Sequence, residues 1–209
     1  MYPFYESKEN SYFFVSTFNN FTFPYHFHNE IELILVLEGE IIISVNDNEK
    51  NLKSGELAVS FPNQIHSYKT TTSSHGIMVI FSPEILGDYF KNKMSYTLSN
   101  PYFNLMTIEQ DVKNIIANLL AQYKENNNEL IIKGMLYQLI GSLDNHFEFK
   151  SSKYIYNNTL QNILSYIQEN YSTHIVLEDV SEYLGISRVY ISKLFKNQKR
   201  MEMAYVRSY

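Results

Sequence analysis

The stretch LEDVSEYLGISRVYISKLFK, residues 177–196, contains the most specific pattern in this chain. Its first half is apolar at helical spacing, with Leu177, Val180 and Leu184 on one face. Gly185 follows, and glycine permits the positive φ that a tight helix C-cap requires. The pattern therefore predicts a short helix that ends in a glycine turn.

A second helix is predicted to begin after Ser187, whose side chain suits a helix N-cap. Its apolar residues Ile191, Leu194 and Phe195 are spaced to face the first helix, which leaves the opposite face basic. Two short helices joined by a tight turn form a helix-turn-helix, whose second helix can enter the major groove of DNA. The alternative is an ordinary helical hairpin with a solvated basic face.

The DNA-binding reading predicts a role for each residue on that basic face. We expect Arg188 and Lys193 to contact base edges or nearby phosphates, and Lys196, Lys199 and Arg200 to contact phosphates alone. The complete predicted DNA-binding set is Ser187, Arg188, Val189, Ser192, Lys193, Lys196, Lys199 and Arg200.

The pattern L-x2-V-S-x2-L-G-I-S-x2-Y-I-S-x-L-F-K resembles the first helix-turn-helix of the AraC/XylS transcription regulators. The resemblance implies promoter DNA as a partner, a ligand-sensing domain and no enzymatic activity. Members of that family carry two such units, and residues 203–209 resemble only the start of the helix that joins them. We therefore expect a truncated regulator whose own DNA binding is weak.

Charge divides the chain in the same way. The protein has 209 residues and a formal charge of -5, yet residues 150–209 carry 8 basic and 5 acidic side chains. Only this last part is expected to attract a polyanion. Cysteine is absent, which excludes disulfides and thiolate metal sites and fits a cytoplasmic protein. Neither a membrane span nor a signal peptide is expected from the sequence.

Short runs of β-branched and aromatic residues fill the first part of the chain. Residues 31–37 and 41–45 are predicted as two strands separated by a turn at Glu38–Gly39, and 57–61 and 77–81 as two more. Such runs predict an antiparallel barrel, so the fold class is α+β with an N-terminal cupin-like β-barrel, paired central helices and a helical C-terminal segment.

The apolar period changes to three and four residues after the strands. It predicts a helix that contains Ile108 to Tyr123, a second from Leu130 to Leu143, and a further helix over 160–171. The polar run Lys150–Lys153 is predicted to be a linker. The expected domains are 1–100 for ligand sensing, 101–149 for a helical dimerisation segment and 150–209 for DNA binding.

A histidine constellation marks the predicted barrel. The spacing His-x-His-x3-Glu-x6-Gly, from His26 and His28 through Glu32 to Gly39, resembles the first cupin motif, and Pro62–His66 an abbreviated second one. Three imidazoles and a carboxylate suit a divalent first-row metal. Three readings stay open: a sensor pocket for a small ligand that needs no cofactor, a pocket that holds a divalent metal, and polar residues that only satisfy one another.

The function we expect is that of a one-component transcription regulator with an unknown small-molecule effector. In the resembled family the paired helices mediate dimerisation and pass the ligand signal to the DNA-binding part, so a homodimer is expected. One alternative is a small metal-dependent cupin enzyme with a vestigial tail. Another is a truncated inhibitor that pairs with full-length relatives.

Overall fold

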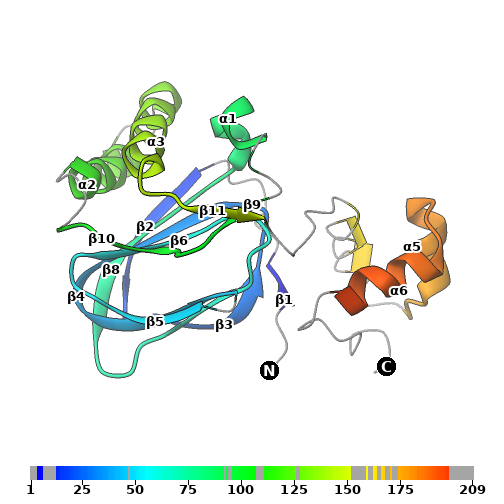
Figure 1. Ribbon diagram of the computed structural model, residues 1–209. Helices are drawn as coiled ribbons and strands as arrows, with labels where there is room; N and C mark the ends of the chain where they lie inside the picture. The colour runs from blue at the N-terminus through cyan, green and yellow to red at the C-terminus, as the bar shows by residue number, and fades with distance from the viewer. Residues whose placement is uncertain are drawn as a thin grey trace.

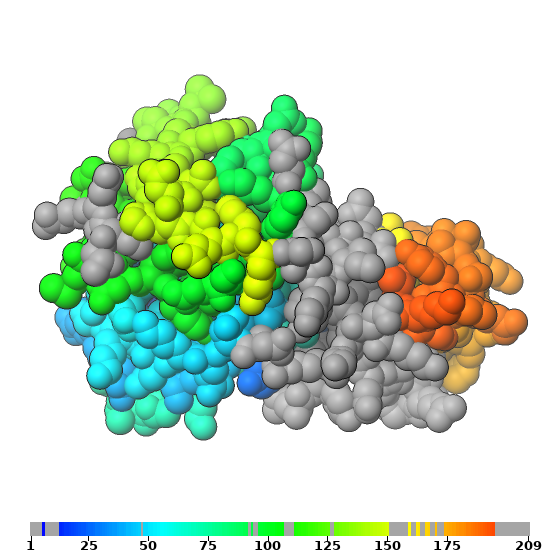
Figure 2. Space-filling model, in the orientation of Figure 1, coloured from blue at the N-terminus to red at the C-terminus, as the bar shows by residue number. Residues whose placement is uncertain are grey.

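The computed structural model describes residues 4–6, 13–46, 48–91, 93, 96–106, 111–125, 128–151, 159, 162–163, 166–167, 170 and 174–197. Within these ranges the chain is a mixed α+β protein (Figure 1). Two helices lie over one face of a large sheet, and two shorter helices lie beside the sheet at the other side of the molecule. The space-filling view shows the latter pair as an orange lobe at one end (Figure 2).

Nine strands form the large sheet, and a separate pair completes the β-structure of the described residues. Neighbouring strands are antiparallel except β1 and β3, which run parallel. The strands are β1 (Phe4–Tyr5), β2 (Phe13–Asn19), β3 (Thr22–Phe27), β4 (Ile31–Val45), β5 (Asn48–Lys53), β6 (Glu56–Ser60), β7 (His66–Lys69), β8 (Ser74–Phe81), β9 (Tyr96–Leu98), β10 (Tyr102–Asn104) and β11 (Phe149–Ser151).

Strand β4 organises the sheet because its two halves take different partners. The first half pairs with β6 and β8, and the second half pairs mainly with β5 and β7. The prediction of two strands with a turn at Glu38–Gly39 is therefore wrong. The chain bends there without ending, since Gly39 has a φ of 72° and the register against β8 shifts between Val36 and Glu38.

The predicted closed barrel is not formed by the described strands. The path of hydrogen-bonded strands runs from β1 through β3, β7, β4 and β6 to β10, and its two ends do not pair with each other. Because β4 passes from one set of partners to the other, the sheet folds into two layers instead (Figure 1). Local strand patterns do not specify closure, which depends on which edge strands meet.

Side chains of β4 alternate between two hydrophobic clusters. Leu33 and Leu35 face α2 (Asp111–Glu125) and α3 (Glu129–Asp144), and belong to the cluster that those helices bury. Ile34 and Val36 belong to the cluster between the two layers of the sheet. Both central helices lie where the apolar period predicts them. They are preceded by η1 (Pro83–Leu86) and α1 (Asp88–Lys91).

Two short helices also lie where the C-terminal pattern predicts them, α5 (Leu177–Leu184) and α6 (Arg188–Asn197). Gly185 ends α5 with a φ of 64°, and its amide donates to the carbonyl oxygens of Ser181 and Glu182. Of the helix predicted over 160–171, residues 162–163 and 166–167 are helical, and residue 170 is in a turn.

The predicted linker is partly a strand. Lys150 and Ser151 belong to β11, which pairs with β9, because the aromatic Phe149 packs against the cluster beneath α2 and α3. In the described part of the chain, no helix has the length and apolarity needed to span a membrane.

Candidate functional site

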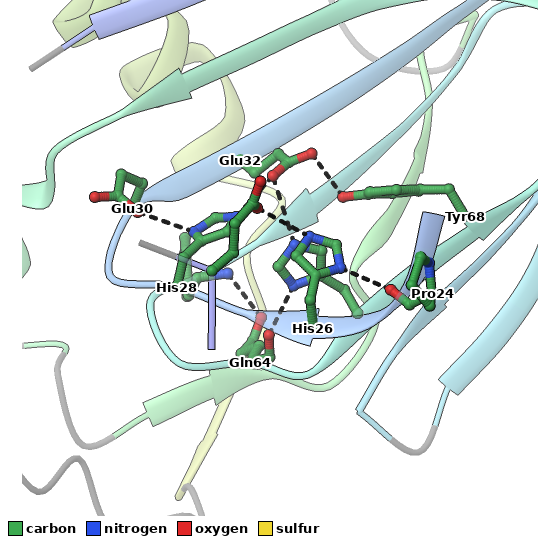
Figure 3. Close-up of polar contacts among 10 residues, drawn as sticks. Pro24, His26, His28, Glu30, Glu32, Gln64 and Tyr68 are labelled. Atoms are coloured by element: carbon green, nitrogen blue, oxygen red, sulfur yellow. Dashed lines mark hydrogen bonds and ion pairs between the residues drawn. The ribbon is translucent and has the colours of Figure 1, made fainter. Parts of the chain in front are cut away.

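The four residues of the histidine constellation come together in the β-structure (Figure 3). His26 lies near the end of β3, His28 just after it, Glu32 near the start of β4 and His66 at the start of β7. β3 and β7 pair with His26 opposite His66. All four side chains are buried, and each offers a ligand atom within 4.8 Å of the others.

Two of the imidazoles are held by the carbonyl group two residues earlier. Nδ1 of His26 donates to the carbonyl oxygen of Pro24 at 2.9 Å, and Nδ1 of His66 donates to that of Gln64 at 2.7 Å. A carbonyl oxygen can only accept, so these bonds place the ring proton on Nδ1 and leave Nε2 as the atom that carries a lone pair. Histidines that bind metals are commonly oriented in this way.

The third imidazole forms a buried ion pair. Nε2 of His28 lies 2.8 Å from Oε2 of Glu32, whose Oε1 accepts a 2.7 Å hydrogen bond from the hydroxyl of Tyr68. Nδ1 of His28 lies 3.2 Å from a carboxylate oxygen of Glu30, without the alignment of a hydrogen bond. The cluster therefore contains a carboxylate that both an imidazole and a phenol hold in place.

Burial and neighbouring charges separate the protonation states of the imidazoles. Burial and the adjacent His66 lower the pKa of His26 to about 3, so this ring is neutral. Burial also disfavours a charge on His28, but the carboxylates of Glu30 and Glu32 outweigh it and raise its pKa to about 9. For Glu32 the cost of burial is likewise outweighed, and the two imidazoles hold its pKa well below the usual range.

The donor set fits a divalent first-row metal ion. It consists of three imidazoles and one carboxylate, all buried, and Nε2 of His66 lies 3.5 Å from Oε2 of Glu32 without forming a hydrogen bond within the described residues. An unpaired buried nitrogen costs free energy, which a bound metal or a hydrogen-bonding ligand would recover. The lone pair of that nitrogen can equally accept a hydrogen bond from a small polar molecule.

Two residues of this cluster were not predicted from the sequence. Tyr68 lies two residues after His66 on β7, so strand alternation places it on the same face and offered a usable signal. Glu30 lies in the turn between β3 and β4, where no periodic pattern indicates direction.

Four of the predicted DNA-binding residues, Arg188, Val189, Ser192 and Lys193, line an open hollow between α5 and α6. Its volume is about 500 Å³, and it is lined by Leu177, Glu178, Arg188, Val189, Ser192 and Lys193. Arg188 forms an ion pair with Glu178, a partner that the sequence did not indicate. Both side chains are exposed, so the guanidinium group is accessible.

The other four predicted DNA-binding residues are Ser187, Lys196, Lys199 and Arg200. Ser187 caps α6, since its hydroxyl accepts a 3.2 Å hydrogen bond from the amide of Tyr190. Lys196 lies within α6, although its side chain is not among those described, and Lys199 and Arg200 lie outside the described residues.

The chain is similar in sequence to known transcription regulators. The chain is 35% identical to the lactose operon transcription activator of Staphylococcus xylosus over 109 residues, which cover 47% of this chain and 39% of that protein. It is 25% identical to the HTH-type transcriptional regulator YdeC of Bacillus subtilis over 203 residues, 89% of this chain and 69% of YdeC. The alignments thus span about two fifths and about two thirds of these relatives.

The fold is similar to that of ToxT from Vibrio cholerae. The two structures superpose with a TM-score of 0.61 at 11% identity, over 94% of this chain and 79% of ToxT. Residues 10–140 match the family model of the AraC-like ligand binding domain. This match covers more than half of the chain, and the chain belongs to the family of AraC-type regulators with an AraC-like ligand-binding domain.

Proposed function

We propose that the chain is a ligand-responsive transcription regulator that binds promoter DNA through α5 and α6, and that it is not an enzyme. The observation that carries the proposal is the two-sided character of α6 in a chain of this family. Ile191 is buried, Lys193 is exposed on the opposite side of the helix, and Arg188 is exposed in its first turn beside the hollow. In this proposal residues 1–100 sense the effector, 101–149 mediate dimerisation and 150–209 bind DNA as a helix-turn-helix domain.

Electrostatics support DNA binding by the C-terminal part alone. The whole chain is acidic, and the excess of basic residues lies in 150–209. Lysine and arginine that neutralise phosphates release counterions, so binding of this kind weakens steeply with salt. We propose that Arg188 and Lys193 read bases or adjacent phosphates, and that the basic residues 196, 199 and 200 contact the backbone.

Protection of the upstream DNA of this chain's own gene tests the proposal. The wild-type protein is expected to protect one site from nuclease digestion, and Arg188→Ala is expected to lose that site. The matched control is Lys113→Ala, which removes a positive charge from α2, outside the candidate DNA-binding helices, and should leave the footprint intact. Equal footprints for wild type and Arg188→Ala would contradict the assigned role.

The effector site in this proposal is the histidine cluster. The buried Nε2 of His66 makes no hydrogen bond within the described residues, and Nδ1 of both His26 and His66 is held by a carbonyl oxygen, so these rings favour an occupant that accepts electron pairs or donates hydrogen bonds. A small polar molecule satisfies this requirement. A divalent metal is the second candidate, which His26, His28, Glu32 and His66 would hold, and when bound it would supply positive charge for an anionic ligand.

Calorimetry with Zn²⁺ separates the two candidates. Protein stripped of metal and purified without a nickel column should bind one Zn²⁺ per chain if the metal reading holds, and His66→Ala should lose that binding. His146→Ala, outside the cluster, is the control. If wild type and His66→Ala respond alike, the metal candidate is excluded and the small polar molecule remains.

The proposed homodimer uses α3. Leu130 is 81% exposed and Ile131 and Tyr137 are also exposed, although large apolar side chains are usually buried. A second copy of the same helix would cover them, which supports dimerisation through this segment.

A further inference from the structure

A third hydrophobic cluster connects the strands of the histidine site to the helices of the C-terminal part. Its buried members are Phe27, Ile65, Ile163, Val180 and Ile191. Phe27 is the last residue of β3, and Ile65 directly precedes β7. Val180 lies in α5 and Ile191 in α6. Partly buried apolar side chains pack around them, among them Tyr25, Leu184 and Leu194.

The two members from the β-structure are adjacent in sequence to residues of the histidine cluster. Phe27 stands between His26 and His28, and Ile65 immediately precedes His66. Because successive side chains of an extended chain point to opposite faces, the histidines point into the cluster of polar groups and Phe27 and Ile65 point away from it. An outward side chain would normally be exposed, yet Phe27 is 3% and Ile65 5% exposed.

Backbone hydrogen bonds hold both neighbours firmly. The carbonyl oxygen of Phe27 accepts from the amide of Glu6 at 2.9 Å, directly after the residues of β1 that pair with β3. The carbonyl oxygen of Ile65 accepts from the amide of Asn46 at 2.7 Å, and the amide of Ile65 donates to Oδ1 of Asn46 at 3.1 Å. Because Phe27 and Ile65 share this backbone with the adjacent histidines, a movement of the backbone at a histidine also moves the neighbouring apolar side chain.

Helix α6 contributes residues both to this third hydrophobic cluster and to the candidate DNA-binding surface. Ile191 is buried in the cluster, whereas Lys193, on the opposite side of the helix, lines the hollow together with Arg188 in the first turn. The central helices do not share this position: the buried residues of α2 and α3 belong to another cluster, in which no described residue of α5 or α6 takes part. These contacts therefore favour a signal path through the third cluster over the expected path through the central helices.

We propose that the outer face of the histidine strands, formed by Phe27 and Ile65, is the docking surface for the chain's own C-terminal helices and couples the histidine cluster to α6. A change in the cluster moves His26, His28 or His66, and their neighbours Phe27 and Ile65 pass that change to the apolar face of α6. The regulatory meaning of this contact rests on the proposed function, while the contact itself does not.

Hydrogen exchange of the full chain tests the docking surface without DNA or effector. In Phe27→Ala and Ile65→Ala, amides of α5 and α6 should exchange at least about tenfold faster than in wild type, while amides of β4 and β8 change by less than about threefold. Leu119→Ala, which opens the cluster beneath α2, is the matched control and should accelerate exchange in α2 but not in α5 or α6. Wild-type exchange of α5 and α6 in both variants would overturn the proposal. Should Phe27→Ala not fold, Phe27→Leu and Ile65→Ala carry the test.

A double-mutant cycle tests the coupling. Glu32→Gln removes the charge that holds His28, and it should change the exchange of α5 and α6 by at least about threefold in the wild-type background. In the Ile65→Ala background the same substitution should have no further effect on these helices. No response to Glu32→Gln, or an equal response in both backgrounds, would overturn the coupling. Because neither assay involves DNA, a failure here is distinguishable from a failure of the proposed DNA binding.

Discussion

The hydroxyl of Tyr68 donates a 2.7 Å hydrogen bond to Oε1 of Glu32, and both side chains are buried. The other carboxylate oxygen faces His28, so one residue from β7 and one imidazole fix the carboxylate from two sides. This arrangement stabilises a charge that burial alone would disfavour.

Tyr68→Phe should therefore destabilise the protein. The substitution keeps the ring but leaves Oε1 of Glu32 without its donor, which is expected to lower the free energy of unfolding by about 1–3 kcal/mol in urea denaturation. Tyr183→Phe removes a hydroxyl from an exposed ring and should stay within about 0.5 kcal/mol of wild type. Equal stabilities of the two variants would contradict the role of the hydrogen bond.

The stability contribution of Asp144 should depend on pH. Partial burial raises its pKa, but Lys93 and Tyr89 outweigh that effect and lower it below the usual value. Because the folded pKa lies below the unfolded value of about 3.9, the contribution is present above that pH and disappears as the pH falls through the folded pKa. Asp144→Asn should be less stable than wild type at pH 7, by at most about 1 kcal/mol because the pair is partly exposed, and the difference should shrink below about pH 4. A difference that grows on acidification would contradict this assignment.

Leu130→Glu should dissociate the proposed dimer. A carboxylate on the exposed apolar face of α3 would have to be buried in the interface, so light scattering at micromolar concentration should show a monomer where wild type is a dimer. The control is Met106→Glu, which places the same charge at an exposed apolar residue outside the helices. A monomeric wild type would remove the dimer from the account.

Glu178→Gln should change DNA binding more than stability. The ion pair with Arg188 is exposed on both sides, so unfolding should change by less than about 0.5 kcal/mol. Removal of a negative charge beside the candidate DNA surface should strengthen binding to scrambled DNA by about threefold and so reduce sequence discrimination. Glu84→Gln, an exposed change in η1, should leave both quantities unaltered. A loss of affinity for all DNA would show that Glu178 has another role.

Local patterns predicted most elements and the membership of the histidine cluster. Alternation and helical spacing are properties of short segments, so β6, β8, α2, α3, α5 and α6 could be located without a structure. The spacing of His26, His28 and Glu32, with His66 from another strand, identified the cluster.

Features that depend on long-range geometry could not be predicted. Gly39 resembles a turn residue, but the partners on both sides of β4 keep the chain in the sheet. The pairing of Arg188 with Glu178 depends on how α5 and α6 cross, and the cover over Phe27 depends on the docking of a distant segment. No periodicity within one segment encodes such contacts.

Fluorescence anisotropy of the wild-type chain on its own upstream DNA and on scrambled DNA, at two salt concentrations, measures whether the chain binds DNA sequence-specifically. We expect an affinity at least about tenfold higher for the upstream DNA, with binding that weakens as salt increases. Equal affinity for the two DNAs at both salt concentrations would contradict the claim that this chain is a sequence-specific DNA-binding regulator.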